Sequence, residues 1–170
     1  MESGKTKIIS VIVENKPGVL HSIANLFRRR NFNIESITVG ATQQKDTARM
    51  TITVNADEKT LDQVVKQVAK QIDVLKVEEL EQGNFVMREL ALIKVEITDS
   101  KKRSDVVNFV NVFRGRIIDI STDSLTVEIT GRPDKIDAFL NLMKTFGVLE
   151  IARTGITALA RGVKSIRIDE

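Results

Sequence analysis

The chain has 170 residues, of which 42% are apolar and 29% are charged, the composition of an ordinary soluble globular protein with one medium domain or two small ones. It has no cysteine and one histidine, which excludes disulfides, thiolate metal ligands and a cysteine nucleophile and argues against a zinc site. The net charge of +3 is a small excess of 26 Lys and Arg over 23 Asp and Glu, and no Trp or Tyr is present to stack on bases, so we expect no nucleic-acid partner.

The sequence also gives no sign of a membrane or of export. The first residues lack the apolar core of a secretory signal, and no uncharged run is long enough to span a bilayer. The densest basic cluster, Arg28-Arg29-Arg30, is typical of the solvated last turn of a helix, where cations interact favourably with the helix dipole. We therefore expect a cytoplasmic protein with no membrane partner.

Hydrophobic periodicity in the first half of the chain alternates between the spacing of strands and that of helices. Residues 8–13 form a nearly unbroken β-branched run, which predicts a strand, and apolar residues over 19–27 then repeat at helical spacing. Pro17 suits the first turn of that helix and Asn31 suits its end. The other elements expected here are strands over 33–42 and 48–54, a helix carrying the apolar residues from Leu61 to Ile72, and a strand over 74–80.

The second half repeats this pattern after a polar linker at residues 81–84. Gly115 is placed to cap one helix and Pro133 opens another. The two halves therefore predict an α+β fold with two ferredoxin-like βαββαβ units, each an antiparallel sheet with both helices on one face. The elements expected in the second half are strands over 90–97, 117–120, 125–129 and 148–153, helices over 104–113 and from 133 onward, and a loosely held tail over 161–170.

A four-stranded sheet with helices on one face leaves the other face and both edges open. Such surfaces are liabilities unless another copy covers them, so we expect a homodimer. In the third expected strand, Arg49, Thr51 and Thr53 alternate with apolar residues. This alternation predicts that the second sheet face is wet rather than packed in a dry sandwich.

The turn between the first strand and the first helix is the best candidate for a ligand site. It leaves the N–H groups of Gly18, Val19 and Leu20 free at the positive end of a helix dipole, where a carboxylate or phosphate would bind. The alternative is a purely structural connection in which Asn15 or Lys16 caps the helix.

No sequence frame for catalysis is present. Phosphate-binding loops, dinucleotide-binding turns and zinc-protease motifs are all missing. His21 has no partner for a dyad, because the adjacent Ser22 does not face it on a helix. We expect no catalytic residue and no metal in this chain, and we interpret His21 as an exposed or boundary helix residue.

Several separated stretches resemble one family in the same order. The sequences ENKPGVL at 14–20 and NIESITVG at 33–40, followed by RMTI at 49–52, look like an ACT domain. With DVLKV at 73–77, REL at 88–90, FRGRIID at 113–119 and ARTG at 152–155, they resemble more narrowly the regulatory (small) subunits of acetolactate synthase, also called acetohydroxyacid synthase. The combined matches are far more specific than any one of them.

This resemblance implies an amino-acid site shared by two chains. In ACT domains the side chains that match Asn15 and Asn33 hold the polar ends of a free amino acid, with Asn33 and Ile34 coming from the opposite subunit. Family members respond to branched-chain amino acids, chiefly valine, whose side chain Leu20, Ile23 and Ile34 could contact. We expect a graded preference among valine, leucine and isoleucine, because one methylene is worth only about 0.8 kcal/mol. The implied valine-binding residues are Asn15, Gly18, Val19, Leu20, Asn33 and Ile34.

The resemblance also implies a non-catalytic regulatory role. Its partner would be a separate catalytic subunit carrying thiamine diphosphate, FAD and Mg²⁺, which this chain would activate and make sensitive to feedback inhibition. We expect residues 5–80 to be the ACT sensor, joined edge to edge in a homodimer, 84–160 to contact and activate the catalytic subunit, and 161–170 to be a tail. One alternative, a freestanding amino-acid sensor or transcriptional regulator, lacks a DNA-reading segment once both units are assigned. Another, a small ferredoxin-like enzyme, is disfavoured by the missing motifs.

Overall fold

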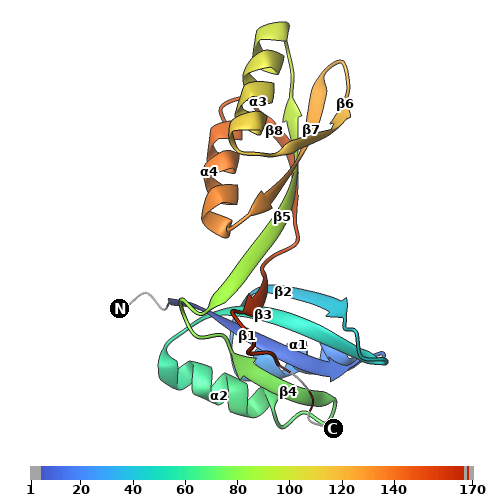
Figure 1. Ribbon diagram of the computed structural model, residues 1–170, viewed down its shortest axis with the longest axis vertical. Helices are drawn as coiled ribbons and strands as arrows, with labels where there is room; N and C mark the ends of the chain where they lie inside the picture. The colour runs from blue at the N-terminus through green and yellow to red at the C-terminus, as the bar shows by residue number, and fades with distance from the viewer. Residues whose placement is uncertain (1–4, 167, 169–170) are drawn as a thin grey trace. The chain divides into compact units, whose positions relative to one another are not determined.

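The chain forms two antiparallel sheets, each with two helices on one face (Figure 1). Apolar residues alternate in the strands and recur at helical spacing in the segments between them. This computed structural model describes residues 5–166 and 168. The described residues form two units, one that runs up to Val86 and resumes at Ile156, and one that runs from Met87 to Gly155. The α+β fold with two βαββαβ units is confirmed. No helix in the described residues is long and apolar enough to cross a bilayer.

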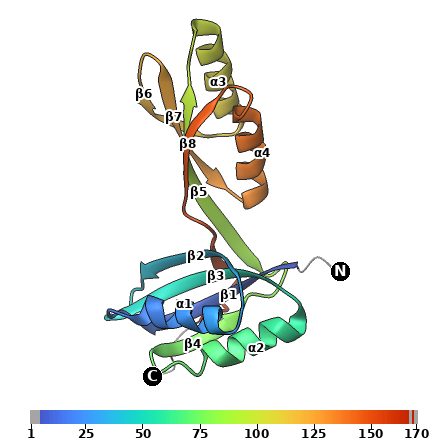
Figure 2. The same ribbon diagram turned by 180° about the vertical axis from the view of Figure 1, so that it is seen from behind.

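The first unit has the strand order β2-β3-β1-β4, with every neighbouring pair antiparallel. Strands β1 and β3 are therefore central, while β2 and β4 are the edges. Figure 2 shows α1 and α2 together on one face of this sheet, where they enclose an apolar core. The elements are β1 (Lys5–Glu14), α1 (Val19–Arg29), β2 (Ile34–Ala41), β3 (Thr47–Ala56), α2 (Glu58–Val68) and β4 (Val74–Glu79).

Asn31 ends α1, as the sequence predicts. Its φ of 55° lies in the left-handed region, which asparagine tolerates better than most residues. The Asn31 N–H donates to the Arg28 carbonyl at 3.1 Å and the Phe32 N–H donates to the Phe27 carbonyl at 3.0 Å, the two bonds of a Schellman motif. The rings of Phe27 and Phe32 meet edge to face with centroids 6.3 Å apart. The reversal that leads into β2 is therefore firmly held.

The second face of this sheet is covered by the C-terminal segment of the same chain, residues 156–166 (Figure 1). This segment contains a strand that the sequence did not predict, β9 (Thr157–Ala160). The Ile156 carbonyl accepts a hydrogen bond from Thr38 Oγ1 at 3.0 Å, and the Ala158 carbonyl accepts one from Arg49 Nη2 at 3.0 Å. Residues 161–166, expected to be part of a loose tail, continue from this strand, and Lys164 lies 3.6 Å from a Glu81 carboxylate oxygen.

This cover shows that the predicted wet face is wrong. Thr51 and Thr53 are only 2% and 1% exposed, and Arg49 is half-buried. Thr53 shares a 2.6 Å hydroxyl hydrogen bond with Ser36. Desolvation lowers the pKa of Arg49, whose Nε, like Ser10 Oγ, is buried without a hydrogen-bond partner among the described residues. Local alternation could not reveal this burial, because the covering segment lies far along the chain.

The second unit has the strand order β6-β7-β5-β8, and β9 pairs with β5. Strand β5 begins in the first unit and continues through the second. Buried residues of β5, β7, α3 and α4 form a separate apolar core. The elements are β5 (Phe85–Glu96), α3 (Ser100–Val112), β6 (Arg116–Ile120), β7 (Ser124–Gly131), α4 (Pro133–Met143) and β8 (Val148–Arg153).

Arg114, rather than the expected Gly115, adopts the left-handed conformation after α3, with φ of 54°. The Arg114 N–H donates to the Asn111 carbonyl at 3.0 Å and the Gly115 N–H donates to the Val110 carbonyl at 2.8 Å. A Cβ on Gly115 would lie 3.1 Å from the carbonyl oxygen of Glu128. Glycine is therefore needed for close approach to β7 rather than for its backbone angle.

An ion cluster joins the two strands through which the chain enters and leaves the second unit. Glu89 of β5 is 5% exposed and accepts from Arg153 of β8 twice, at 2.6 Å from Nε and 2.8 Å from Nη2. Asp137 of α4 accepts from Arg153 Nη1 at 2.8 Å. Hydrogen bonding, chiefly to Glu89, raises the pKa of Arg153. This bidentate pair holds β5 beside β8 near the point where the chain enters and leaves the second unit.

Candidate ligand-binding site

The turn between β1 and α1 is shaped by Gly18. This residue occupies the N-cap position with φ of 91°, and no side chain caps the helix. The alternative in which Asn15 or Lys16 caps α1 is therefore wrong, because a glycine in the left-handed region already makes the turn. Pro17 also lies before the helix rather than in its first turn, since α1 begins at Val19.

The first amides of α1 are free, as the sequence predicts. The Ser22 N–H donates to the Gly18 carbonyl at 2.9 Å and starts the helical ladder. Among the described residues, the N–H groups of Gly18, Val19 and Leu20 have no acceptor. The first turn of α1 carries no acidic residue that could compete for these groups. Three donors and the positive dipole end therefore remain available to an anion.

The turn is held from two sides. The Asn15 N–H donates to the Asp46 carbonyl at 2.8 Å, and the Glu14 N–H donates to the Asp73 carbonyl at 3.0 Å. Lys16 Nζ lies 2.7 Å from Asp73 Oδ1 and 2.5 Å from Glu14 Oε2, and these interactions, Asp73 first, raise the pKa of Lys16. Lys16 therefore anchors the turn, while the Asn15 side chain is exposed and has no partner among the described residues.

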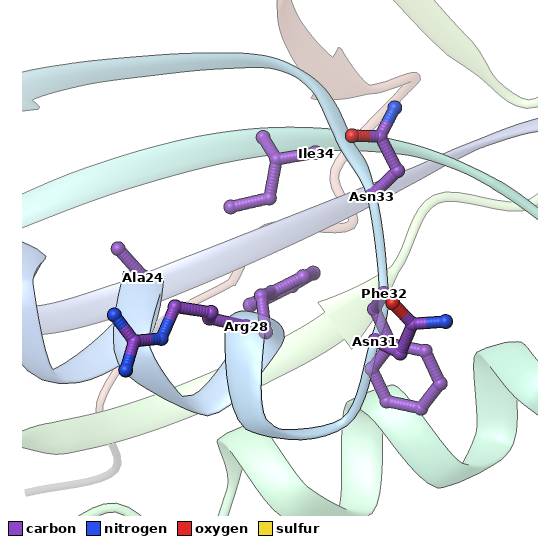
Figure 3. Close-up of a pocket in the computed structure, with 7 residues that line it drawn as sticks. Ala24, Arg28, Asn31, Phe32, Asn33 and Ile34 are labelled. Carbon is purple, nitrogen blue, oxygen red and sulfur yellow. The ribbon is translucent and has the colours of Figure 1, made fainter.

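Asn33 and Ile34 lie elsewhere in the unit, at the start of edge strand β2. The exposed Asn33 side chain donates to Glu35 Oε1 at 2.8 Å, and Ile34 is partly buried. Both residues line an open pocket beside the end of α1 (Figure 3). None of Asn15, Gly18 and Leu20 lines it. Within one chain, the structure therefore does not bring the two groups of expected site residues into one pocket.

The apolar residues proposed for ligand contact divide in the same way. Leu20 is 48% exposed and accessible beside the free amides. Ile23 is 1% exposed and packs in the core, so the expectation that it contacts a ligand is wrong. The Val19 side chain is also buried, which leaves only its amide available. Ile23 was proposed because it is one of the apolar residues of this amphipathic helix, but the apolar side of the helix packs against the sheet and is not open to a ligand.

The structure adds pocket residues that the sequence interpretation missed. Ala24 and Arg28 line the pocket from α1, together with Asn31 and Phe32 from the reversal. Ala24 and Arg28 are spaced at i and i+4, which places them on one helix face, and that spacing was the available signal.

His21 is exposed, as predicted, and its Nε2 lies 2.6 Å from the side-chain nitrogen of Asn25. The structure thus gives His21 a local helix partner one turn away.

Known proteins match this chain across both units. A family model described as the small subunit of acetolactate synthase matches residues 88–162, and one described as an AHAS small subunit-like ACT domain matches residues 9–76. The probable acetolactate synthase small subunit of Methanothermobacter thermautotrophicus is 52% identical over 161 residues, covering 95% of this chain and 96% of that one. The acetolactate synthase small subunit of Mycolicibacterium smegmatis is 48% identical over 161 residues, covering 95% and 94%. The crystal structure of the Thermotoga maritima small subunit superposes with a TM-score of 0.87 at 44% identity, covering 93% and 98%.

Proposed function

Because the chain belongs to the family of acetolactate synthase small subunits, we propose that it activates a separate catalytic subunit and gives it feedback inhibition by valine. A regulatory role in branched-chain amino-acid biosynthesis follows from that membership and from the ACT domain. The carbon chemistry, with thiamine diphosphate, FAD and Mg²⁺, resides on the catalytic partner in this proposal.

The observation that carries the effector site is the set of free amides at Gly18, Val19 and Leu20. A carboxylate seated there would accept charge-assisted hydrogen bonds, each contributing about 1.5 to 3 kcal/mol. Asn15 lies three residues before Gly18, its side chain is exposed and without a partner among the described residues, and it can bind the other polar end of an amino acid.

A second copy of the chain completes the site. Ile34 begins β2 and Asn33 directly precedes it, and β2 is an edge strand that offers backbone groups for pairing with another chain. Two copies joined edge to edge would bring this strand start to the turn of the partner. Effector binding and dimer geometry are then thermodynamically linked.

The hydrocarbon side chain of the effector is expected to give only a modest difference in affinity among valine, leucine and isoleucine. Burying a valine side chain against Leu20 and Ile34 would contribute about 1.5 to 3 kcal/mol. Leucine adds one methylene, worth about 0.8 kcal/mol, so valine, leucine and isoleucine should differ in affinity by degrees rather than absolutely.

Regulation at a distance requires the effector to bind two states of the complex unequally. A coupling free energy of about 1 to 3 kcal/mol is typical. We assign sensing to residues 5–80 and contact with the catalytic subunit to residues 84–160, with 161–170 as the remaining end of the chain.

Reconstitution tests this function directly. The purified chain should co-purify with a thiamine-dependent acetolactate synthase catalytic subunit, raise its rate of acetolactate formation, and lower that rate again when valine is added. Calorimetric titration of the chain alone should show binding of valine, leucine and isoleucine. A chain that neither co-purifies nor activates would contradict the proposal, and absence of heat with all three amino acids would contradict its effector.

Mixed dimers test whether the site is shared. Asn15→Ala and Asn33→Ala each disrupt both sites of a homodimer, whereas a dimer with one chain of each kind retains one intact site. Co-expressed variants should therefore recover valine binding that neither variant shows alone. No recovery, in dimers verified to be mixed, would place the whole site within one chain.

A further inference from the structure

The open pocket beside the end of α1 has an apolar floor and a polar rim. Its volume is ≈ 420 Å³. Ala24, Phe27 and Ile34 supply the apolar wall, and Phe27 is only 1% exposed. Figure 3 shows Ala24, Arg28 and Ile34 around one space, with Asn31 and Asn33 where the chain turns into β2. This combination suits a small molecule with both a hydrocarbon and charged groups.

Arg28 supplies the cation of this pocket. Its guanidinium is exposed and has no ion pair or hydrogen bond among the described residues. The nearby Arg30 is engaged, since its Nη2 donates to Gln67 Oε1 at 3.2 Å. Arg29 is also exposed and has no partner in the part of the chain that the structure describes, but it does not line the pocket. Of the three adjacent arginines, Arg28 alone combines a pocket position with a free cation.

We propose that Arg28 contacts the carboxylate of the effector, and that the wall formed by Ala24, Phe27 and Ile34 receives its hydrocarbon side chain. The identity of the effector as a branched-chain amino acid rests on the function proposed above. Guanidinium N–H groups match a carboxylate in geometry as well as in charge. The side-chain carbonyls of Asn31 and Asn33 can accept hydrogen bonds from the ammonium group. The pocket is thus the portion of the site that one chain supplies, and the turn amides of the partner chain complete it.

The test compares two charge-neutralising variants of the full-length chain by calorimetric titration. Arg28→Gln should weaken valine binding by about tenfold or more, while the matched control Arg29→Gln should stay within about twofold of the unmodified chain. Valinamide, which replaces the carboxylate by a neutral amide, should bind equally to the unmodified chain and to Arg28→Gln. Circular dichroism of each variant checks that the fold is kept.

The outcomes separate this inference from the proposed function. If the unmodified chain binds valine and Arg28→Gln binds it as well as Arg29→Gln does, the role of Arg28 is wrong while the effector stands. An equal loss with valine and valinamide also overturns it, since Arg28 would then act on the pocket rather than on the carboxylate. If the unmodified chain binds none of valine, leucine and isoleucine, both proposals fall.

Discussion

Gly18 combines a backbone requirement with a position beside the free amides. Its φ of 91° strains any other residue, yet a Cβ there would meet nothing within 4 Å. The obstacle to substitution is therefore conformation rather than space. Asparagine and aspartate tolerate left-handed angles better than most residues, so these two substitutions differ mainly in charge.

Gly18→Asp should abolish valine inhibition while activation of the catalytic subunit persists, because the new carboxylate repels the one that must bind there. Gly18→Asn, the neutral control of the same shape, should retain part of the sensitivity. Acetolactate formation by the reconstituted enzyme over a valine titration measures both effects. Full valine sensitivity in Gly18→Asp would place the effector elsewhere.

Arg153 neutralises a buried carboxylate, since the Glu89 side chain is only 4% exposed. Arg153→Met should therefore destabilise the second unit by about 3 kcal/mol, the lower end for a broken buried pair, because Arg153 itself remains about a third exposed. The double variant Arg153→Met with Glu89→Leu should lose less stability than the single one. Urea unfolding of the unmodified chain and the two variants gives the comparison, and a double variant that loses as much stability as Arg153→Met, or more, would contradict this role of the pair.

At the scale of single elements, the cap of a helix can make the stability of the folded chain depend on pH. Asp99 caps α3 by accepting the Lys102 N–H at 2.8 Å, and this backbone hydrogen bond is the first cause that lowers the pKa of Asp99 below its usual 3.8. A depressed pKa in the folded state means that the charged cap stabilises above pH 3.8 and loses this contribution as the pH falls through the lowered value.

Asp99→Asn keeps a capping oxygen but removes the charge. The variant should be less stable than the unmodified chain at neutral pH, and the difference should disappear once the pH is below the lowered pKa of Asp99. Unfolding midpoints across a pH series measure this. Asp123→Asn, in an exposed hairpin turn, is the matched control for replacing an aspartate by asparagine outside a helix cap. A difference that persists in acid would attribute the loss to geometry rather than charge.

Elements governed by local preferences could be predicted from the sequence, and those governed by distant contacts could not. Asn31 was identified because a left-handed residue after a helix is a local feature. The burial of Thr51 and the short strand β9 were missed because each depends on a tertiary contact with a distant part of the chain. Thr51 is buried because the C-terminal segment covers its sheet face, and that segment contains β9. In the candidate site, the free amides at Gly18 could be predicted from local geometry. The spacing of Ala24 and Arg28 places them on one helix face, but that they line a pocket depends on the chain reversal that packs beside them.

At the scale of the whole molecule, the cover over the first sheet changes how its sensor must be isolated. Ile8 and Ile12 are 4% and 5% exposed on the face that residues 156–166 cover. A chain ending at Gly83 would lack this cover and expose apolar residues and strand edges. An isolated sensor that keeps valine binding therefore needs the C-terminal segment in addition to residues 5–80.

A trimmed chain in which a short glycine-serine linker replaces residues 87–155 should fold, bind valine and fail to activate the catalytic subunit. The chain that simply ends at Gly83 should be less stable and more prone to aggregate, because its sheet face is uncovered. Thermal unfolding, valine calorimetry and the activation assay compare the two proteins. Activation by the trimmed chain would reverse the roles assigned to the units, and equal stability of both would deny the importance of the cover.

The polypeptide passes from the first unit to the second after Val86 and returns to the first unit at Ile156. Two chain connections therefore join the units, and cutting one of them leaves the other intact. A single protease nick at Gly155 would leave the released end seated on the sheet by hydrogen bonds such as that from Arg49 to Ala158, while β5 still connects the units. Such a nicked protein should migrate as one particle under native conditions and separate into two peptides only when denatured.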